Sequence, residues 1–295
     1  MRIDVREGMG VDLLAPCRKY PPKDSPFFQE SRFIEDGKFS LPAYESGIRG
    51  FCSSKCPAYE KGKSPIEYII VGTWHKCPLH CVACSLRADD EPVLPDEDMA
   101  DYLFSLGELN AAAKVHNERF HLPGPLVEIG GAGDIFYSEN YRKILSTDLR
   151  KYGMDNIGIM TNMQQWLPRN IEILENGVGN SLRRVSFAVD SINPAAYEAI
   201  RKGSSWRRLL YSYRRCVSAF PGIEYEIIFT LSRLNLHAYE KVPAILKEIF
   251  PEVSLITVKM ARSDVLGLPP NIQEEVKRWC AAYEGNGFKL VYSGL

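Results

Sequence analysis

The chain has 295 residues, of which 45% are hydrophobic and 25% are charged, with 36 basic against 37 acidic side chains and a net charge of −1. These proportions are ordinary for one large α/β domain, alone or with a small extension. They argue against nucleic-acid binding through a basic surface, and no apolar run is long enough to span a membrane. The first ten residues mix charges without an apolar core, so no signal peptide is expected and a cytoplasmic location is predicted.

Residues 1–64 are predicted to form an irregular cysteine-containing cap over the rest of the chain, residues 65–295. Six prolines and several glycines interrupt any long periodicity in this segment. It also holds Cys17, Cys52 and Cys56, three of the eight cysteines in the chain. Without an export signal, cysteines are expected to be metal ligands or buried thiols rather than disulfides.

From residue 65, short apolar runs alternate with amphipathic stretches, which is typical of buried parallel strands connected by helices. The expected strands are 67–72, 126–130, 156–161, 184–189, 224–231 and 255–260, and an edge strand is expected at 288–292. The expected helices are 96–118, 138–151, 166–175, 194–202, 206–219, 237–250 and 271–284.

Six strand–helix units predict a parallel sheet. Eight such units would close a TIM barrel, whereas six are compatible with an open partial barrel or with a flat, doubly wound sheet. Both arrangements place a functional site at the carboxyl ends of the strands. The residues that follow each strand are therefore the candidates for function.

The loop after the first expected strand carries Cys77, Cys81 and Cys84 at CxxxCxxC spacing. Three thiolates within eight residues can surround one iron–sulfur cluster, and a cubane held by three thiolates keeps one iron open for a small molecule. The alternative is a structural zinc knuckle, which needs a fourth ligand. His80 could supply that ligand, but it lies between two of the cysteines and would strain the loop.

Glycines and polar residues follow the other expected strands at the same edge. Glycines let a backbone approach a ligand closely. Asn162 also fits an Asx turn, Asp190 also fits a helix cap, and Lys259 could be a solvated charge. The candidate residues are Gly130, Gly131, Ala132, Gly133 and Asp134 after the second strand, Asn162 after the third, Ser186 and Asp190 on the fourth, and Lys259 and Met260 on the sixth.

The cysteine spacing, the glycine-rich segment 130–134 and the fourth unit, residues 185–203, together resemble the radical S-adenosylmethionine (radical SAM) superfamily. The resemblance covers roughly residues 66–262. It is nearest to the SPASM/twitch-type enzymes, but a C-terminal SPASM domain is absent because only Cys280 follows residue 262. The resemblance implies a partial (β/α)6 TIM-like barrel with an irregular N-terminal extension.

The resemblance also implies a 4Fe-4S cluster on the three cysteines, with S-adenosylmethionine (SAM) chelated by the open iron. Reductive cleavage of SAM would yield a radical that removes a hydrogen atom from a peptide or another small-molecule natural product, with an electron donor such as flavodoxin or ferredoxin. The glycine segment would hold the SAM amino group, although Ala132, Gly133 and Asp134 replace the usual acid–proline ending. Ser186 and Asp190 would approach the SAM ribose or carboxylate.

Cys17, Cys52 and Cys56 are interpreted as a second iron–sulfur cluster or a zinc site. Two other functions remain open for the chain as a whole. One is a non-catalytic zinc or iron–sulfur binding protein on the same fold. The other is an activase that installs a glycyl radical on a partner enzyme, although activases usually have shorter and simpler chains.

Overall fold

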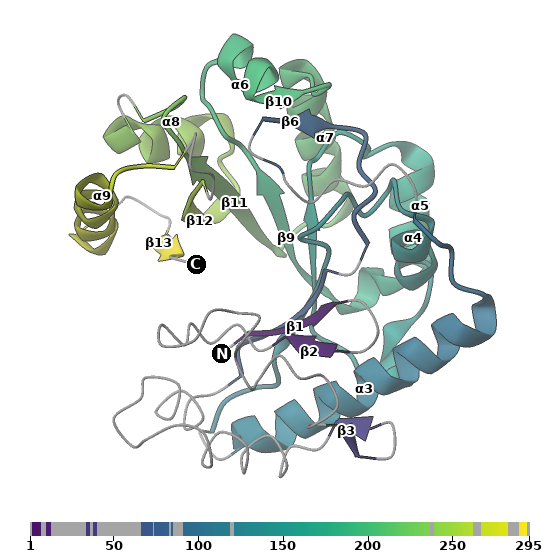
Figure 1. Ribbon diagram of the computed structural model, residues 1–295. Coiled ribbons are helices and arrows are strands. Elements are labelled where there is room, and N and C mark those ends of the chain that lie inside the picture. The colour runs from purple at the N-terminus through teal and green to yellow at the C-terminus, as the bar shows by residue number, and fades with distance from the viewer. Residues whose placement is uncertain are drawn as a thin grey trace, which may run out of the picture.

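The computed structural model describes residues 2–6, 10–12, 34–35, 38–39, 66–72, 74–82, 84, 91–118, 121–236, 239–261, 267–282 and 289–293. In these ranges the chain forms one large sheet that curves into an arc, with helices along its outer side, as Figure 1 shows. No helix among the described residues combines the length and apolarity needed to cross a membrane.

The large sheet has nine strands in the order β13-β12-β11-β9-β8-β7-β5-β1-β2. Neighbouring strands run parallel except for the antiparallel pair of β1 and β2. The strands are β1 (Arg2–Arg6), β2 (Gly10–Asp12), β5 (Tyr68–Val71), β7 (Leu126–Ile129), β8 (Ile157–Thr161), β9 (Leu182–Ala188), β11 (Glu224–Leu231), β12 (Val253–Met260) and β13 (Lys289–Ser293). The six strands expected from the apolar runs are all present, and the predicted partial TIM-like barrel is confirmed.

Several helices begin at residues whose side chains cap them. Asn193 accepts a hydrogen bond from the Ala196 amide at 3.0 Å, immediately before Pro194. The helices are α3 (Asp96–Glu118), α4 (Glu139–Leu145), α5 (Pro168–Asn176), α6 (Pro194–Ile200), α7 (Trp206–Ala219), α8 (Val242–Ile249) and α9 (Pro270–Ala282). The 3-10 turns are η4 (Leu149–Tyr152), η5 (Val178–Ser181) and η6 (Tyr239–Lys241).

Alternation along the strands separates an apolar outer face from a more polar concave face. Val185 and Phe187 of β9 are fully buried in the core between the sheet and the helices. Ser186, between them, faces the opposite way. It meets Glu128 of β7 and Glu226 of β11, so carboxylates lie inside the arc. The hydrophobic core therefore sits outside the sheet, and the concave side is left for polar chemistry.

Several details differ from the sequence-based expectation. The expected helix 194–202 ends at Ile200, and Arg201 and Lys202 form a short strand. The segment 138–151 is divided into α4 and η4, because α4 ends at Leu145 with Ser146 as its C-cap and Asp148 caps the following turn. The segment 237–250 likewise contains η6 before α8. In the N-terminal segment, β1 pairs in parallel with β5 and so extends the sheet. Besides the large sheet, β3 (Ile34–Glu35) pairs with β4 (Lys38–Phe39), and β6 (His80–Cys81) pairs with β10 (Arg201–Lys202).

Candidate cofactor site

The candidate site lies where β5, β7, β8 and β9 end. Because these strands are parallel neighbours, their carboxyl ends meet at one edge of the sheet. The cysteine loop follows β5, the glycine loop 130–134 follows β7, Asn162 follows β8 and Asp190 follows β9. The structure thus brings most of the predicted residues to a common edge, as parallel α/β folds do.

The cysteine loop is held by backbone contacts to the segment after α6. Cys81 in β6 pairs with Arg201 in β10, and the Val82 amide donates to the Ile200 carbonyl at 2.9 Å. The Cys84 amide donates to the Cys81 carbonyl at 3.1 Å, which closes a turn between these two cysteines. The loop is therefore anchored on the fourth strand–helix unit, far along the chain from β5.

The three cysteines of this loop carry free thiols. Cys77 and Cys81 are half-buried, and Cys84 is exposed. Burial raises the pKa of the Cys77 thiol to about 11, and it also raises the pKa of Cys81, against the opposing charge of Arg201. The protons on these two thiols would have to leave when a metal centre binds, since the thiolate is the ligand.

Among the described residues, no three Cys, His, Asp or Glu side chains converge on a point that could hold a single metal ion. A cubane does not require the three sulfur atoms to converge on one point, because each thiolate binds its own iron at a separate corner. Three free soft sulfur donors in one anchored loop have the donor chemistry that such a cluster takes.

The glycine loop packs directly against the cysteine loop. Gly130 has φ of +111°, and a Cβ there would lie 2.5 Å from the Met160 carbonyl oxygen. Gly133 has φ of +63°, and a Cβ there would lie 2.6 Å from the carbonyl oxygen of Lys76. Tyr141 connects the same two loops, because its hydroxyl accepts from the Trp74 amide at 3.3 Å and donates to the Ala132 carbonyl at 3.2 Å. The sequence-based reasoning missed Tyr141.

Gly133→Ala is expected to lower the free energy of unfolding by more than Gly153→Ala does. Gly153 also has a positive φ, of +73°, but nothing lies within 4 Å of its Cβ position. Both variants take the left-handed penalty of about 1–2 kcal/mol. Only the first adds a collision with backbone, worth roughly 1–3 kcal/mol more. Urea denaturation of both variants measures the difference, and equal losses would contradict the close contact of the two loops.

Asp134, predicted as a cofactor residue, is fully buried in the structure. Its Oδ2 accepts from the Thr161 hydroxyl and from the Asn162 amide, both at 3.0 Å, and its Oδ1 accepts from the Phe136 amide at 3.1 Å. Burial raises the pKa of Asp134, while these donors act in the opposite direction. The carboxylate therefore joins the glycine loop to the end of β8.

Asn162 lies at the same junction and is 4% exposed. Its Oδ1 accepts from the Gln164 amide at 2.8 Å, which is the Asx turn considered from the sequence. Its Nδ2 lies 3.7 Å from the Cys77 sulfur and donates to it. One amide group thus serves two contacts: its oxygen closes the turn, and its nitrogen contacts the cysteine loop.

Ser186 lies deeper on the concave face and is completely buried. Its Oγ is 2.7 Å from Glu226 Oε2 and 3.2 Å from Glu128 Oε1. Glu226 also accepts a short hydrogen bond from Thr257 and lies 3.9 Å from Arg184. Ser186 is therefore part of a polar network that crosses the interior of the arc from β7 to β12.

Asp190 forms a buried ion pair with Arg201 at 2.7 Å, and their side chains are 8% and 10% exposed. Burial alone would lower the pKa of Arg201, but Asp190 raises it above its usual value. Asp190 also accepts from the Thr230 amide at 3.2 Å. Arg201 Nε has no hydrogen-bond partner among the described residues. Arg201 was not predicted as a site residue, because the sequence placed it inside the expected helix 194–202, whereas the structure ends this helix at Ile200.

The structure describes fewer contacts for the remaining predicted residues. Lys259 and Met260 form the end of β12, where they pair with Thr230 and Leu231 of β11. Cys17, Cys52 and Cys56 lie outside the described residues.

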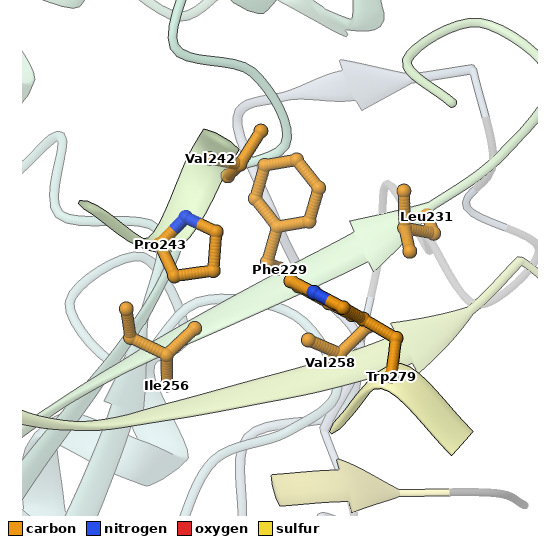
Figure 2. Close-up of a pocket in the computed structure, with 7 residues that line it drawn as sticks. All are labelled: Phe229, Leu231, Val242, Pro243, Ile256, Val258 and Trp279. Carbon is orange, nitrogen blue, oxygen red and sulfur yellow. The ribbon is translucent and has the colours of Figure 1, made fainter. Parts of the chain in front are cut away.

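An apolar pocket lies on the other side of the sheet. Its lining residues from β11 and β12 alternate with Thr230, Thr257 and Lys259, so they face the helices rather than the concave side. The pocket is therefore separate from the candidate site. Figure 2 shows its lining of Phe229, Leu231, Val242, Pro243, Ile256, Val258 and Trp279.

No family model and no curated protein match the sequence. Many solved structures resemble the fold, including the following two. SuiB from Streptococcus suis, in a structure bound to S-adenosylmethionine, aligns over 78% of this chain and 47% of its own, with 14% identity and a TM-score of 0.52. A radical SAM methyltransferase from Sphaerobacter thermophilus aligns over 77% of this chain and 65% of its own, with 13% identity and a TM-score of 0.50.

This chain spans about half the length of SuiB and somewhat less than two thirds of the methyltransferase. The fold expected from the cysteine and glycine motifs is confirmed by this likeness. The chain shares its fold with SuiB and with the radical SAM methyltransferase.

Proposed function

We propose that this protein is a radical SAM enzyme whose 4Fe-4S cluster is held by Cys77, Cys81 and Cys84. The observation that carries the proposal is the position of three free thiols in an anchored loop at the carboxyl edge of the sheet, in contact with the glycine loop. The three cysteines would hold the cluster, which would supply the electron for reductive cleavage of SAM and so the means of removing a hydrogen atom from a substrate.

The backbone of the glycine loop, Gly130, Gly131, Ala132 and Gly133, is proposed to hold the amino end of SAM. Gly131 suits this role because its Cβ position, with φ of +102°, has no atom nearer than 3.7 Å. Asp134 is proposed to position this loop, since both of its oxygens accept hydrogen bonds from the protein.

Asp190 is proposed to act at the cofactor through Arg201. The buried guanidinium keeps an unpartnered Nε donor beside the cysteine loop, within the part of the chain that the structure describes. A buried donor without a partner is unfavourable, and the carboxylate of SAM is an acceptor of the right charge. Ser186, Lys259 and Met260 are proposed to contribute to the same cofactor site.

The substrate is proposed to be a peptide or another small-molecule natural product, and the electron donor to be a flavodoxin or a ferredoxin. The substrate proposal rests on the resemblance of residues 185–203 to SPASM/twitch-type enzymes. The cysteine pair Cys52 and Cys56, with Cys17 upstream, supports the proposal of an auxiliary iron–sulfur cluster or a zinc ion in the N-terminal segment.

Anaerobic reconstitution with iron and sulfide tests the proposed function. The full chain is expected to take up about four irons at the first site. The reduced protein should show an EPR signal that changes when SAM is added. It should release 5′-deoxyadenosine only when both SAM and dithionite are present. A colourless protein that binds stoichiometric zinc and does not respond to SAM would instead support the non-catalytic zinc protein.

A further inference from the structure

The amide group of Asn162 has its two ends fixed by different parts of the site. Its Oδ1 accepts from the Gln164 backbone amide at 2.8 Å, so the opposite end, Nδ2, is directed away from this turn. Nδ2 lies 3.7 Å from the sulfur of Cys77. The side chain is 4% exposed, so little water competes for this donor. The hydrogen bond to sulfur therefore follows from the local backbone and does not depend on a freely rotating side chain.

Asp134 holds the partners of this hydrogen bond in place from both sides. Its carboxylate accepts from the Asn162 backbone amide at 3.0 Å. Its own amide donates to the carbonyl of Lys76, the residue before Cys77, at 2.9 Å. One fully buried residue thus connects the donor and the sulfur, and their separation is set by the protein before any cluster binds.

We infer that Asn162 donates an N–H···S hydrogen bond to the Cys77 ligand and thereby raises the reduction potential of the cluster, with Asp134 as its positioning residue. This inference rests on the proposed function. Reduction adds one electron to the cluster and increases the negative charge on the ligand sulfur, without making or breaking a covalent bond or moving a proton. A donor to that sulfur strengthens in the reduced state, and hydrogen bonds to sulfur are a recognised determinant of cluster potential.

Asn162→Ser tests the inference. A serine hydroxyl can still accept from the Gln164 amide, but it is too short to reach Cys77. At a fixed applied potential the ratio of reduced to oxidised cluster is expected to fall by about threefold to tenfold, and a tenfold fall equals about 59 mV for one electron. The measurement is a dithionite titration of the reconstituted full chain, with mediators, followed by the EPR signal.

Asn140→Ser is the matched control. Asn140 is also a buried asparagine that bonds the backbone at both ends, through Leu94 and Pro92, and neither of these hydrogen bonds goes to a cysteine. This control should leave the potential unchanged. Asn162→Asp is the second variant in case serine disturbs folding, because it keeps the Oδ1 acceptor and loses the donor, and it should lower the potential further.

The outcomes separate this inference from the proposed function. If wild type forms the cluster and the Asn162 variants, at equal iron content, keep the wild-type potential, the inference is wrong and the proposed function stands. A lower potential in the Asn162 variants but not in the Asn140 variant supports it. A wild-type chain that takes up no iron–sulfur cluster removes the proposed function, and this inference with it.

Discussion

Replacing Cys84 with alanine is expected to reduce SAM cleavage to background while the fold is retained. Cys84 is the exposed member of the triad, so its removal leaves no cavity in the core. Even residues that only hydrogen-bond to metal ligands lower metal affinity or activity by about 10–100-fold when they are replaced, and loss of a ligand should exceed that. The measurements are 5′-deoxyadenosine released with dithionite, iron per chain, and the circular dichroism spectrum.

Val82→Ala provides the comparison within the same loop. Val82 is 43% exposed, and its structural contact is a backbone hydrogen bond that alanine preserves. Its iron content and SAM cleavage should match wild type. If Cys84→Ala retained both the cluster and the cleavage, the assignment of the cluster to the CxxxCxxC loop would be wrong.

Arg201→Met is expected to destabilise the protein by about 3–5 kcal/mol, because it leaves the Asp190 carboxylate buried without its cation. The two groups are 2.7 Å apart and their side chains are about nine-tenths buried. The measurement is the free energy of unfolding from urea denaturation. The same variant should also bind SAM more weakly at equal iron content, because the proposed carboxylate donor is gone.

Two further variants distinguish the effect of breaking the buried ion pair from the effect of removing a positive charge elsewhere. Arg201→Met combined with Asp190→Asn should recover much of the lost stability, since the amide removes the unpaired buried charge and keeps an oxygen acceptor for the Thr230 amide. Arg150→Met removes a cation from the exposed pair with Asp148, at 2.8 Å, and should leave the urea midpoint almost unchanged. Equal effects of the two arginine substitutions would contradict the burial of Arg201.

The elements that could be predicted from the sequence are those with local causes. The strand 224–231 and the helices 96–118 and 206–219 were predicted with the bounds that the structure has. Their signals depend only on residues that are close together in the sequence: continuous apolar runs, acidic first turns and helical spacing. The strand β1 was not predicted: Ile3 and Val5 alternate with charged residues as in a half-buried strand, but the run is short and its partners, β2 and β5, are apparent only in the structure.

The candidate site was predictable in its location but not in its internal contacts. The cysteine spacing and the glycines marked the carboxyl edge, and the parallel fold brought them together. Whether Asp134 points at a ligand or at the end of β8 depends on Thr161 and Asn162, which the sequence places far away. Arg201 was missed for the same reason, because its importance comes from Asp190 and from the pairing of β10 with β6.

The pairing of Cys81 with Arg201 has a consequence for how the protein is made. The two residues are 120 positions apart in the chain, so the cysteine loop lacks its antiparallel partner while the intervening segment is still on the ribosome. At roughly 5–20 residues per second, this interval lasts roughly 6–24 seconds. The loop reaches its anchored form only after four of the six predicted strands have been synthesised, so any metal centre that needs this form enters it only after synthesis has passed residue 201.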